Sequence, residues 1–166
     1  MQITFLPIEI DELQTVLQLF KEAAEKIAKM NVDHWQYWKN PPTEKIDWIK
    51  EGLKNKEFYF IKNTNDELIG MVRILHEDKM YWGIQQEKAL YIHSLVVREQ
   101  FEGKGFGNII INKVAEKAKS LNYPYLRLDA VAKNTKLCNY YKKLGFKKID
   151  EKSLPLSVNY LFQKEI

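Results

Sequence analysis

The segment Arg98–Asn108, REQFEGKGFGN, places three of the chain's seven glycines within five residues. Glycine loses more backbone entropy on folding than any other residue, so such a cluster needs a structural reason. It follows the apolar run Ala89–Val97 and precedes a helical pattern. A glycine-rich turn between a strand and a helix presents backbone N–H groups to an anion, and the missing Cβ atoms let a phosphate approach closely.

The spacing of the glycines separates three kinds of phosphate loop. A Walker A loop requires G-x-x-x-x-G-K-[ST], which this segment does not contain. A dinucleotide fingerprint needs a third glycine where Asn108 stands, and only 37 residues follow Asp129, the acid placed to bind a ribose. The pattern Gln100-x-x-Gly103-x-Gly105 remains. A strand-to-helix turn without a ligand is the alternative.

This pattern resembles the [RQ]-x-x-G-x-[GA] loop of the GCN5-related N-acetyltransferase (GNAT) superfamily, which holds the pyrophosphate of acetyl-CoA. A second stretch, residues 134–146, is similar to the later superfamily motif N-x-x-A-x-x-x-Y-x-x-x-G-F. It departs from that motif at Leu137 and Cys138, which stand where the motif has a small residue. The two motifs occur in the expected order. The residues at the matching positions of the second motif are Asn134, Tyr141, Gly145 and Phe146.

The resemblance implies acetyl-CoA as cosubstrate. Main-chain groups of the strand before the loop are expected to bind the pantetheine arm, and an N–H near Leu95 or Val96 to hold the oxyanion. Asn134 is expected to hydrogen-bond the same arm. The cofactor-binding residues implied are Leu95, Val96, Val97, Gln100, Phe101, Glu102, Gly103, Lys104, Gly105, Phe106, Gly107, Asn134 and Tyr141.

Acetyl transfer to an amine requires a base, a stabilised oxyanion and a proton donor for the departing thiolate. The resemblance makes Tyr141 the proton donor, with buried aromatic packing as the alternative role. His93 is the first candidate base because imidazole titrates near neutral pH, and Glu87 is the second. An ordinary polar residue on the sheet is the alternative for His93. Cys138 has no flanking sign of activation, so we expect direct attack in a ternary complex.

Aromatic residues outside the regular elements are candidates for the acceptor pocket: Trp35, Trp38 and Trp82, together with His93. Aromatic faces beside acids suit a cationic amine. The resemblance implies a small-molecule primary amine of polyamine, amino sugar or amino acid type. Acetylation of a protein N-terminus or lysine is an alternative, as is a catalytically silent acyl-CoA-binding module. Relatives commonly form dimers, so a homodimer is expected only from the resemblance.

Hydrophobic periodicity predicts the element order β-α-α-β-β-β-α-β-α-β-β, an α/β fold with a mixed sheet in one domain, residues 1–166. The resemblance implies that this fold is of GNAT type. An antiparallel meander should precede one parallel, right-handed crossover. Asp11 is the expected N-cap of the first helix. Strict alternation along the central strand places His93 on the same face as Leu95 and Val97, unless a bulge intervenes.

Charge and composition limit the class of protein. The 166 residues are 45% hydrophobic, which predicts a globular domain. Residues 98–148 carry a net charge of +8 and the remainder −4, so an anionic ligand is expected in the basic part. Its lysines lie opposite apolar helical stripes, which predicts a solvated surface and no nucleic-acid partner.

Other absences in the sequence lead to further expectations. No run approaches the roughly 18 apolar residues of a membrane span, and no secretory signal pattern begins the chain, so no membrane partner is expected. The lone Cys138 fits a reducing compartment, which predicts a cytoplasmic protein. No Cys/His pairing or H-x-x-E pattern occurs, so no metal site is expected.

Overall fold

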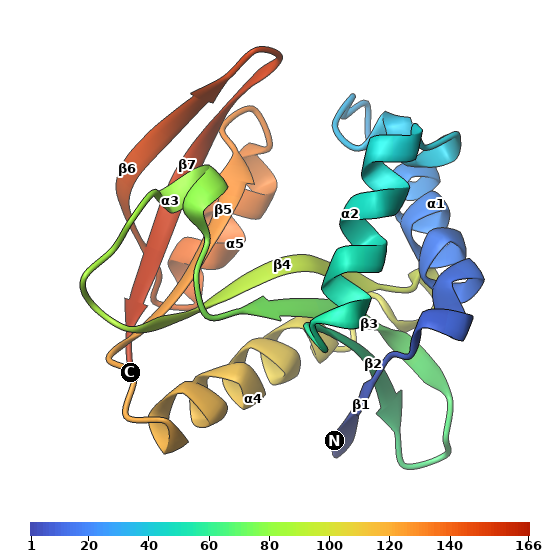
Figure 1. Ribbon diagram of the computed structural model, residues 1–166, viewed down its shortest axis with the longest axis horizontal. Coiled ribbons are helices and arrows are strands. Elements are labelled where there is room, and N and C mark those ends of the chain that lie inside the picture. Colours follow the sequence, from blue (N-terminus) through green and yellow to red (C-terminus); the bar gives the residue numbers. More distant parts are fainter. The chain divides into compact units, whose positions relative to one another are not determined.

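The computed structural model describes residues 1–166 and confirms the predicted order of elements (Figure 1). The short helix α3 is an addition to that order. No helix combines the length and the apolar character needed to cross a bilayer. The helices are α1 (Leu13–Lys29), α2 (Thr43–Lys54), α3 (Lys79–Trp82), α4 (Phe106–Ser120) and α5 (Thr135–Lys143). The strands are β1 (Ile3–Pro7), β2 (Phe58–Asn63), β3 (Leu68–Leu75), β4 (Ala89–Val97), β5 (Tyr125–Val131), β6 (Lys147–Leu154) and β7 (Ser157–Glu165).

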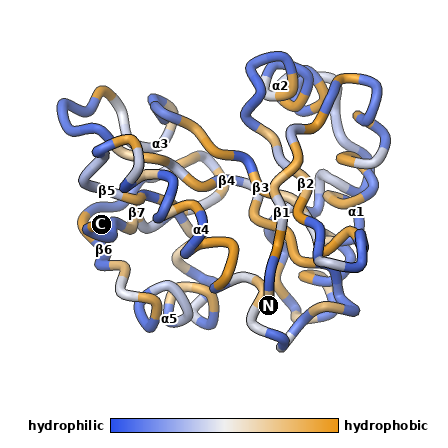
Figure 2. Tube along the Cα trace, turned by 90° about the horizontal axis from the view of Figure 1, so that it is seen from below, coloured by the Kyte–Doolittle hydropathy of each residue, from blue (hydrophilic) through white to orange (hydrophobic).

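The strands follow the order β1-β2-β3-β4-β5-β7-β6. β1 and β2 pair antiparallel, as do β2 and β3, whereas β4 and β5 run parallel with Ala89 opposite Tyr125. β7 pairs antiparallel with both β5 and β6. The predicted mixed sheet with one parallel crossover is therefore confirmed. β3 is buried over six of its eight residues, and Figure 2 shows it as a mainly hydrophobic strand.

The chain divides into two compact units. The first comprises Met1–Arg73 and Ser94–Ile110, and the second comprises Ile74–His93 and Ile111–Ile166. The divisions fall within β3, β4 and α4. The prediction of one domain over residues 1–166 stays a prediction.

The start of α1 differs from the expected one. Asp11 was predicted as the N-cap, but a 3-10 turn, Ile10–Glu12, precedes α1. Glu9 and Glu12 form a reciprocal capping box, in which each side chain accepts a hydrogen bond from the backbone N–H of the other residue. Because this pair begins the helical turn before Asp11, the predicted cap is wrong.

The core of the first unit is aromatic and surrounds a buried arginine. Phe20 of α1 stacks on Trp38, with ring centroids 4.0 Å apart. Arg73 of β3 donates from Nη2 and Nε to Glu57 Oε2, at 2.6 and 2.9 Å, and its guanidinium lies 4.1 Å from the ring centre of Trp48. A Cβ atom at Gly52 of α2 would lie 2.5 Å from Phe58 Cε2 and 2.9 Å from Arg73 Cζ, so a larger residue there would force these side chains to shift.

A second buried arginine organises the other unit. Arg127 of β5 is 2% exposed and donates to Gln163 Oε1 and the Tyr91 hydroxyl, at 2.8 and 2.9 Å. Its guanidinium lies over the rings of Trp82, Tyr91 and Tyr125. The hydrophobic cluster of this unit therefore forms around a cation that is satisfied by both hydrogen bonds and aromatic faces.

Glu57→Gln should lower the free energy of unfolding by about 3 kcal/mol, because it leaves the Arg73 charge buried without its counter-charge. Urea denaturation measures this change. The matched control is Asp66→Asn, which removes the exposed Lys62–Asp66 pair and should cost less than about 0.5 kcal/mol. Equal effects of the two variants would contradict the role given to the buried pair.

Candidate functional site

The glycine cluster forms the loop between β4 and α4. Gly103 and Gly105 have φ angles of +69° and +80°, a backbone conformation that residues other than glycine rarely adopt. A Cβ built at either position meets no heavy atom within 4 Å, so the backbone is open on that side. Gly107 lies in the first turn of α4, the end at which helix N–H groups point outward along the axis. The loop has the backbone geometry of an anion cradle.

Aromatic side chains hold this loop to the first unit. Phe101 and Phe106 are both buried and meet edge to face, with centroids 5.8 Å apart. The Lys104 ammonium lies 5.4 Å from the Phe101 ring centre. Since the two phenyl rings face the core, any ligand contact from Phe101 or Phe106 would come from the main chain.

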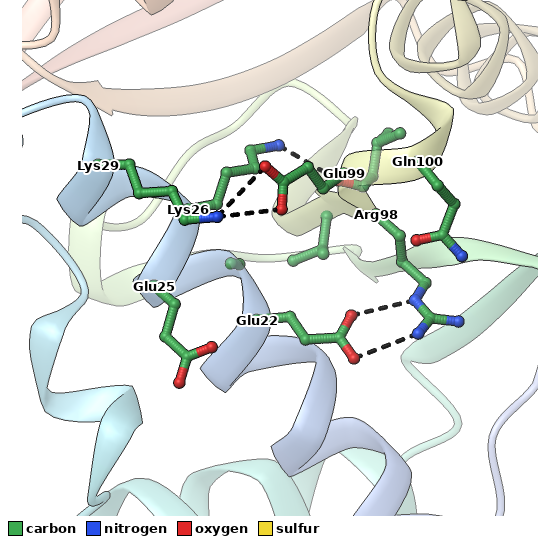
Figure 3. A pocket seen from close by; sticks show the side chains of 10 residues that line it. Glu22, Glu25, Lys26, Lys29, Arg98, Glu99 and Gln100 are labelled. Carbon is green, nitrogen blue, oxygen red and sulfur yellow. Dashed lines mark hydrogen bonds and ion pairs between the residues drawn. The ribbon is translucent and has the colours of Figure 1, made fainter.

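A cavity of about 230 Å³ lies between α1 and the end of β4 (Figure 3). Arg98 forms a two-pronged pair with Glu22, at 3.0 and 3.2 Å, and Lys29 contacts Glu99 at 3.3 Å. Charged residues of α1 thus pair with the residues that follow β4. These ion pairs hold Arg98 and Glu99, the first residues after β4, against α1 and so position the start of the glycine loop.

Lys26 of α1 makes two further contacts with the same segment. Its ammonium donates to the Val97 carbonyl at 3.3 Å and pairs with Glu102 at 2.5 Å. The carboxylate of Glu102 would repel an anion in the loop, and Lys26 neutralises it. The basic character expected from the sequence therefore depends partly on a helix outside the basic stretch.

The central strand β4 does not alternate throughout. Ser94 has a φ of +50°, so the two-residue period is interrupted at that residue. An interruption of this kind is the exception that was allowed for in placing His93 on the face of Leu95 and Val97, and their shared face stays a prediction. The carbonyl of Val96 lies where a Cβ at Gly70 would be only 1.8 Å away, so this part of β4 needs glycine as its neighbour.

His93 lies between two aspartates in the second unit. Its Nε2 is 2.8 Å from Asp78 Oδ2, and its Nδ1 is 3.6 Å from Asp129 Oδ1. Asp78 is the N-cap of α3, and Asp129 belongs to β5. Asn159 of β7 donates from Nδ2 to Asp129 Oδ2 at 2.6 Å. The predicted base thus has carboxylate partners on both sides.

The electrostatics of this cluster follow from its burial. The side chains of Asp78, His93 and Asp129 are 5%, 12% and 11% exposed. Burial raises the pKa of Asp129, while His93 and the hydrogen bond from Asn159 act in the opposite direction. The carboxylate and ring atoms lie within 4.8 Å of one another, a distance at which three such groups can hold a metal ion. The absence of a metal stays a prediction.

Tyr141, the predicted proton donor, is buried in the second unit against Phe146 and Phe162. Burial raises the pKa of its hydroxyl far above the ordinary value, and the charge of Asp129 adds to this shift. The hydroxyl therefore keeps its proton at physiological pH. That state is the one a general acid requires.

Two other predicted or considered residues have structural partners. The Asn134 side chain caps α5, since its Oδ1 accepts from Leu137 N at 3.1 Å. Its contact with the pantetheine arm stays a prediction. Cys138 is buried, its Sγ lies 3.6 Å from the Val131 carbonyl, and burial raises the pKa of its thiol. An unreactive thiol agrees with the expectation that no acyl-cysteine forms.

The remaining predicted residues take part in packing. Trp38 is buried on Phe20, and Trp35 meets the same ring edge to face at 5.7 Å. Trp82 is 7% exposed and lies under Arg127. Glu87 approaches Arg127 at 3.5 Å, so the second candidate base already has a cationic partner. Roles for these residues at an acceptor or as base stay predictions.

Sequence reasoning identified neither Asp78 and Asp129 as partners of His93 nor Asn159 as the partner of Asp129. Asp129 attracted notice only as a possible ribose ligand. One local signal was available, because Asp78 stands directly before α3, at the N-cap position, where aspartate is a preferred residue. Nothing local marks Asn159, because its role depends on the pairing of β7 with β5.

Comparison with known proteins gives the family. The model of the acetyltransferase (GNAT) family matches residues 16–146. The chain belongs to the GNAT acetyltransferase family. The resemblance found in the glycine loop and the second motif is thereby confirmed, and the GNAT chain has the mixed sheet expected of that family.

Two proteins with similar sequences are both named N-acetyltransferases. The GNAT chain is 28% identical to an uncharacterized N-acetyltransferase, YesJ, of Bacillus subtilis over 120 residues, or 69% of this chain and 65% of that protein. It is 25% identical to an uncharacterized N-acetyltransferase, MJ1207, of Methanocaldococcus jannaschii, over 82% of this chain and 57% of that protein. The match therefore spans less than two thirds of both relatives.

A GNAT-family acetyltransferase structure from Listeria monocytogenes superposes with a TM-score of 0.79 at 20% identity, covering 99% of this chain and 95% of that one. At 20% sequence identity, this structural similarity establishes the fold alone. The predicted α/β architecture is thus confirmed by a solved structure of the same family as well as by the strand order.

Gly105→Ala should weaken acetyl-CoA binding at least tenfold, because a methyl group would enter the open side of the loop where a phosphate must approach. Isothermal titration calorimetry with acetyl-CoA measures the change. Gly83→Ala is the matched control, since Gly83 also has a positive φ, +65°, with no atom within 4 Å of its Cβ position. Both variants should lose about 1 kcal/mol of stability through backbone strain. Equal acetyl-CoA affinity in the two variants would contradict a cradle at Gly105.

Proposed function

We propose that this chain is an acetyl-CoA-dependent N-acetyltransferase that acetylates a primary amine of a small molecule by direct attack in a ternary complex. The observation that carries the proposal is the 2.8 Å contact between His93 Nε2 and Asp78, which orients an imidazole as a base. Family membership and the relatives' names support the reaction class. A polyamine, amino sugar or amino acid is the acceptor class proposed.

The glycine loop supports the choice of cosubstrate. Positive φ angles at Gly103 and Gly105, open space on their Cβ sides and the N-terminus of α4 fit a pyrophosphate. Main-chain groups of Leu95, Val96 and Val97 are the proposed partners of the pantetheine arm. Bound acetyl-CoA would supply the acetyl thioester, and the chain's own residues would bind it, orient it and move protons.

The proposed proton transfers balance as follows. With Nε2–H donated to Asp78, His93 Nδ1 is the basic ring atom and takes one proton from the ammonium group of the acceptor. The neutral amine attacks the thioester carbonyl, forming the C–N bond and, as the tetrahedral intermediate collapses, breaking the C–S bond. Tyr141, kept protonated by its burial, gives its proton to the departing thiolate. The extra proton on the nitrogen of the new amide then neutralises the Tyr141 phenolate, and the proton held by His93 leaves to solvent.

Direct attack is preferred to a covalent acyl-enzyme. Cys138 is the chain's one thiol, and it is buried with a raised pKa. Thiolate, not thiol, is the attacking species in acyl transfer to cysteine. The proposal also includes a cytoplasmic location and a homodimer, both of which come from the sequence and the family resemblance.

His93→Gln should lower kcat at pH 7 by at least a hundredfold, because the acceptor ammonium loses its proton acceptor. A primary amine becomes neutral by itself at high pH, so the deficit should shrink as the pH rises toward the amine's own pKa. The measurement is thiol release from acetyl-CoA over a panel of spermidine, glucosamine, lysine and n-hexylamine between pH 6 and 10. A deficit of constant size across this range would contradict His93 as base.

Tyr141→Phe should lower kcat at least tenfold while the dissociation constant for acetyl-CoA changes less than twofold, since only the leaving-group proton is lost. The matched control is Tyr140→Phe, which removes the neighbouring hydroxyl. Thiol release and calorimetry measure the two quantities. Unchanged turnover in Tyr141→Phe would reduce Tyr141 to a packing residue, and acetyl-CoA binding without turnover on any amine or peptide would favour the silent binding module.

A further inference from the structure

The glycine loop begins where a 3-10 turn, η3 (Glu99–Phe101), ends. The N–H groups of Phe101 and Glu102 both donate to carbonyls at the start of this turn, at 2.9 and 3.1 Å. Backbone N–H groups that could bind an anion therefore begin at Gly103, where φ becomes positive. The side chain directly before them is that of Glu102, and its carboxylate repels an anion at this point.

The family pattern [RQ]-x-x-G-x-[GA] fits the loop in two registers, because the three glycines stand at alternate positions. One register starts at Gln100. The other starts at Glu102 and ends on Gly105 and Gly107, so a glutamate stands where the pattern has arginine or glutamine. Since the open backbone begins after Glu102, this second register puts the glutamate at the edge of the anion site. An anion held here would therefore need a cation from another part of the chain.

Lys26 of α1 supplies a cation at this place. Its ammonium pairs with Glu102 at 2.5 Å and donates to the Val97 carbonyl at 3.3 Å, so it is held from both sides of η3. An ammonium group has three N–H donors, and these two contacts leave one for a ligand. The Lys26 side chain is 24% exposed and lines the cavity of about 230 Å³ beside α1, so a ligand oxygen can reach it (Figure 3).

The other cations near the loop have partners elsewhere. Arg98 and Lys29 each pair with one carboxylate, and the Lys104 ammonium lies 5.4 Å from the centre of the Phe101 ring. Lys29 is 66% exposed, so water and salt screen its charge strongly. The charge of Lys26 is less screened, because its side chain is less exposed. Lys26 is thus the cation best placed to bind an anion at the start of the open backbone.

We propose that Lys26 is a cosubstrate-binding residue. Its ammonium donates a hydrogen bond to the diphosphate of acetyl-CoA in the glycine loop, while Glu102 and the Val97 carbonyl hold it in position. This role rests on the proposed function, which makes acetyl-CoA the cosubstrate. A residue of α1, outside both sequence motifs, thus provides the charge that position 102 lacks. Glu102 is then a positioning residue, because it acts through Lys26.

The test compares ligands with and without the diphosphate. Binding of acetyl-CoA, inorganic pyrophosphate and S-acetylpantetheine to wild type and Lys26→Met is measured by calorimetry, or by NMR titration for the weaker ligands. Lys26→Met should raise the dissociation constants of acetyl-CoA and pyrophosphate at least tenfold and change that of S-acetylpantetheine less than twofold.

Two further variants serve as controls. Lys21→Met, at an exposed position of the same helix, should change none of the three dissociation constants more than twofold. Lys26→Arg keeps the charge and should keep the affinity for acetyl-CoA within threefold of wild type. Retention of affinity in Lys26→Arg guards against misfolding as the cause of the loss in Lys26→Met.

A double variant separates direct binding from simple neutralisation of Glu102. If Lys26 acted only by cancelling that carboxylate, Lys26→Met/Glu102→Gln would bind acetyl-CoA as tightly as Glu102→Gln. We expect the double variant to bind at least fivefold more weakly than Glu102→Gln, because the hydrogen bond to the diphosphate is lost as well. KM for acetyl-CoA should follow the same order while kcat stays within twofold, since the diphosphate is remote from the reacting carbonyl.

Three outcomes contradict the role of Lys26: unchanged affinity for acetyl-CoA in Lys26→Met, an equal loss for S-acetylpantetheine, or equal affinity of the double variant and Glu102→Gln. If no amine releases thiol from acetyl-CoA while diphosphate binding still depends on Lys26, the proposed function fails and the role of Lys26 stands. If wild type binds neither acetyl-CoA nor pyrophosphate, both proposals fail.

Discussion

Charge that is buried in this protein has to be matched inside it, and this constraint governs both compact units. Arg73 in the first unit and Arg127 in the second are almost fully enclosed, and each combines carboxylate or amide partners with aromatic faces. The packing around Arg73 affects other residues, because a Cβ at Gly52 would come within 3 Å of both Phe58 and Arg73. The same constraint explains why Trp82, which the sequence suggested as a ligand contact, packs against Arg127.

The His93 cluster applies the constraint in a different way. Arg73 pairs with Glu57, and Arg127 bonds Gln163 and Tyr91, although Arg73 Nη1 is buried without a hydrogen-bond partner. The carboxylates of Asp78 and Asp129 share one imidazole. A site that is under-compensated in charge is poorly stabilised by itself, but it is suited to a ligand of the opposite charge.

The glycine loop depends on backbone rather than side chains. Its anion-binding character comes from positive φ angles and from the start of α4, and the loop's own glutamates work against it. Lys26 and Lys29 of α1 pair with Glu102 and Glu99 and so remove that opposition. The net charge counted over residues 98–148 therefore left out the helix that supplies the compensating lysines.

The sequence by itself determined the element order, the parallel crossover, the glycine loop and the family, because these features rest on local periodicity and on spacing within short segments. It placed the cap of α1 at Asp11, since the competing Glu9–Glu12 pair is visible only as a contact. Tertiary structure alone decided the neighbours of His93. Asp78 and Asp129 lie 15 and 36 residues from it along the chain, and Asn159 lies 30 residues beyond Asp129. Which side chains meet there is fixed by the register of β4, β5 and β7 and by the cap of α3, and no periodic pattern in one segment encodes the register of another.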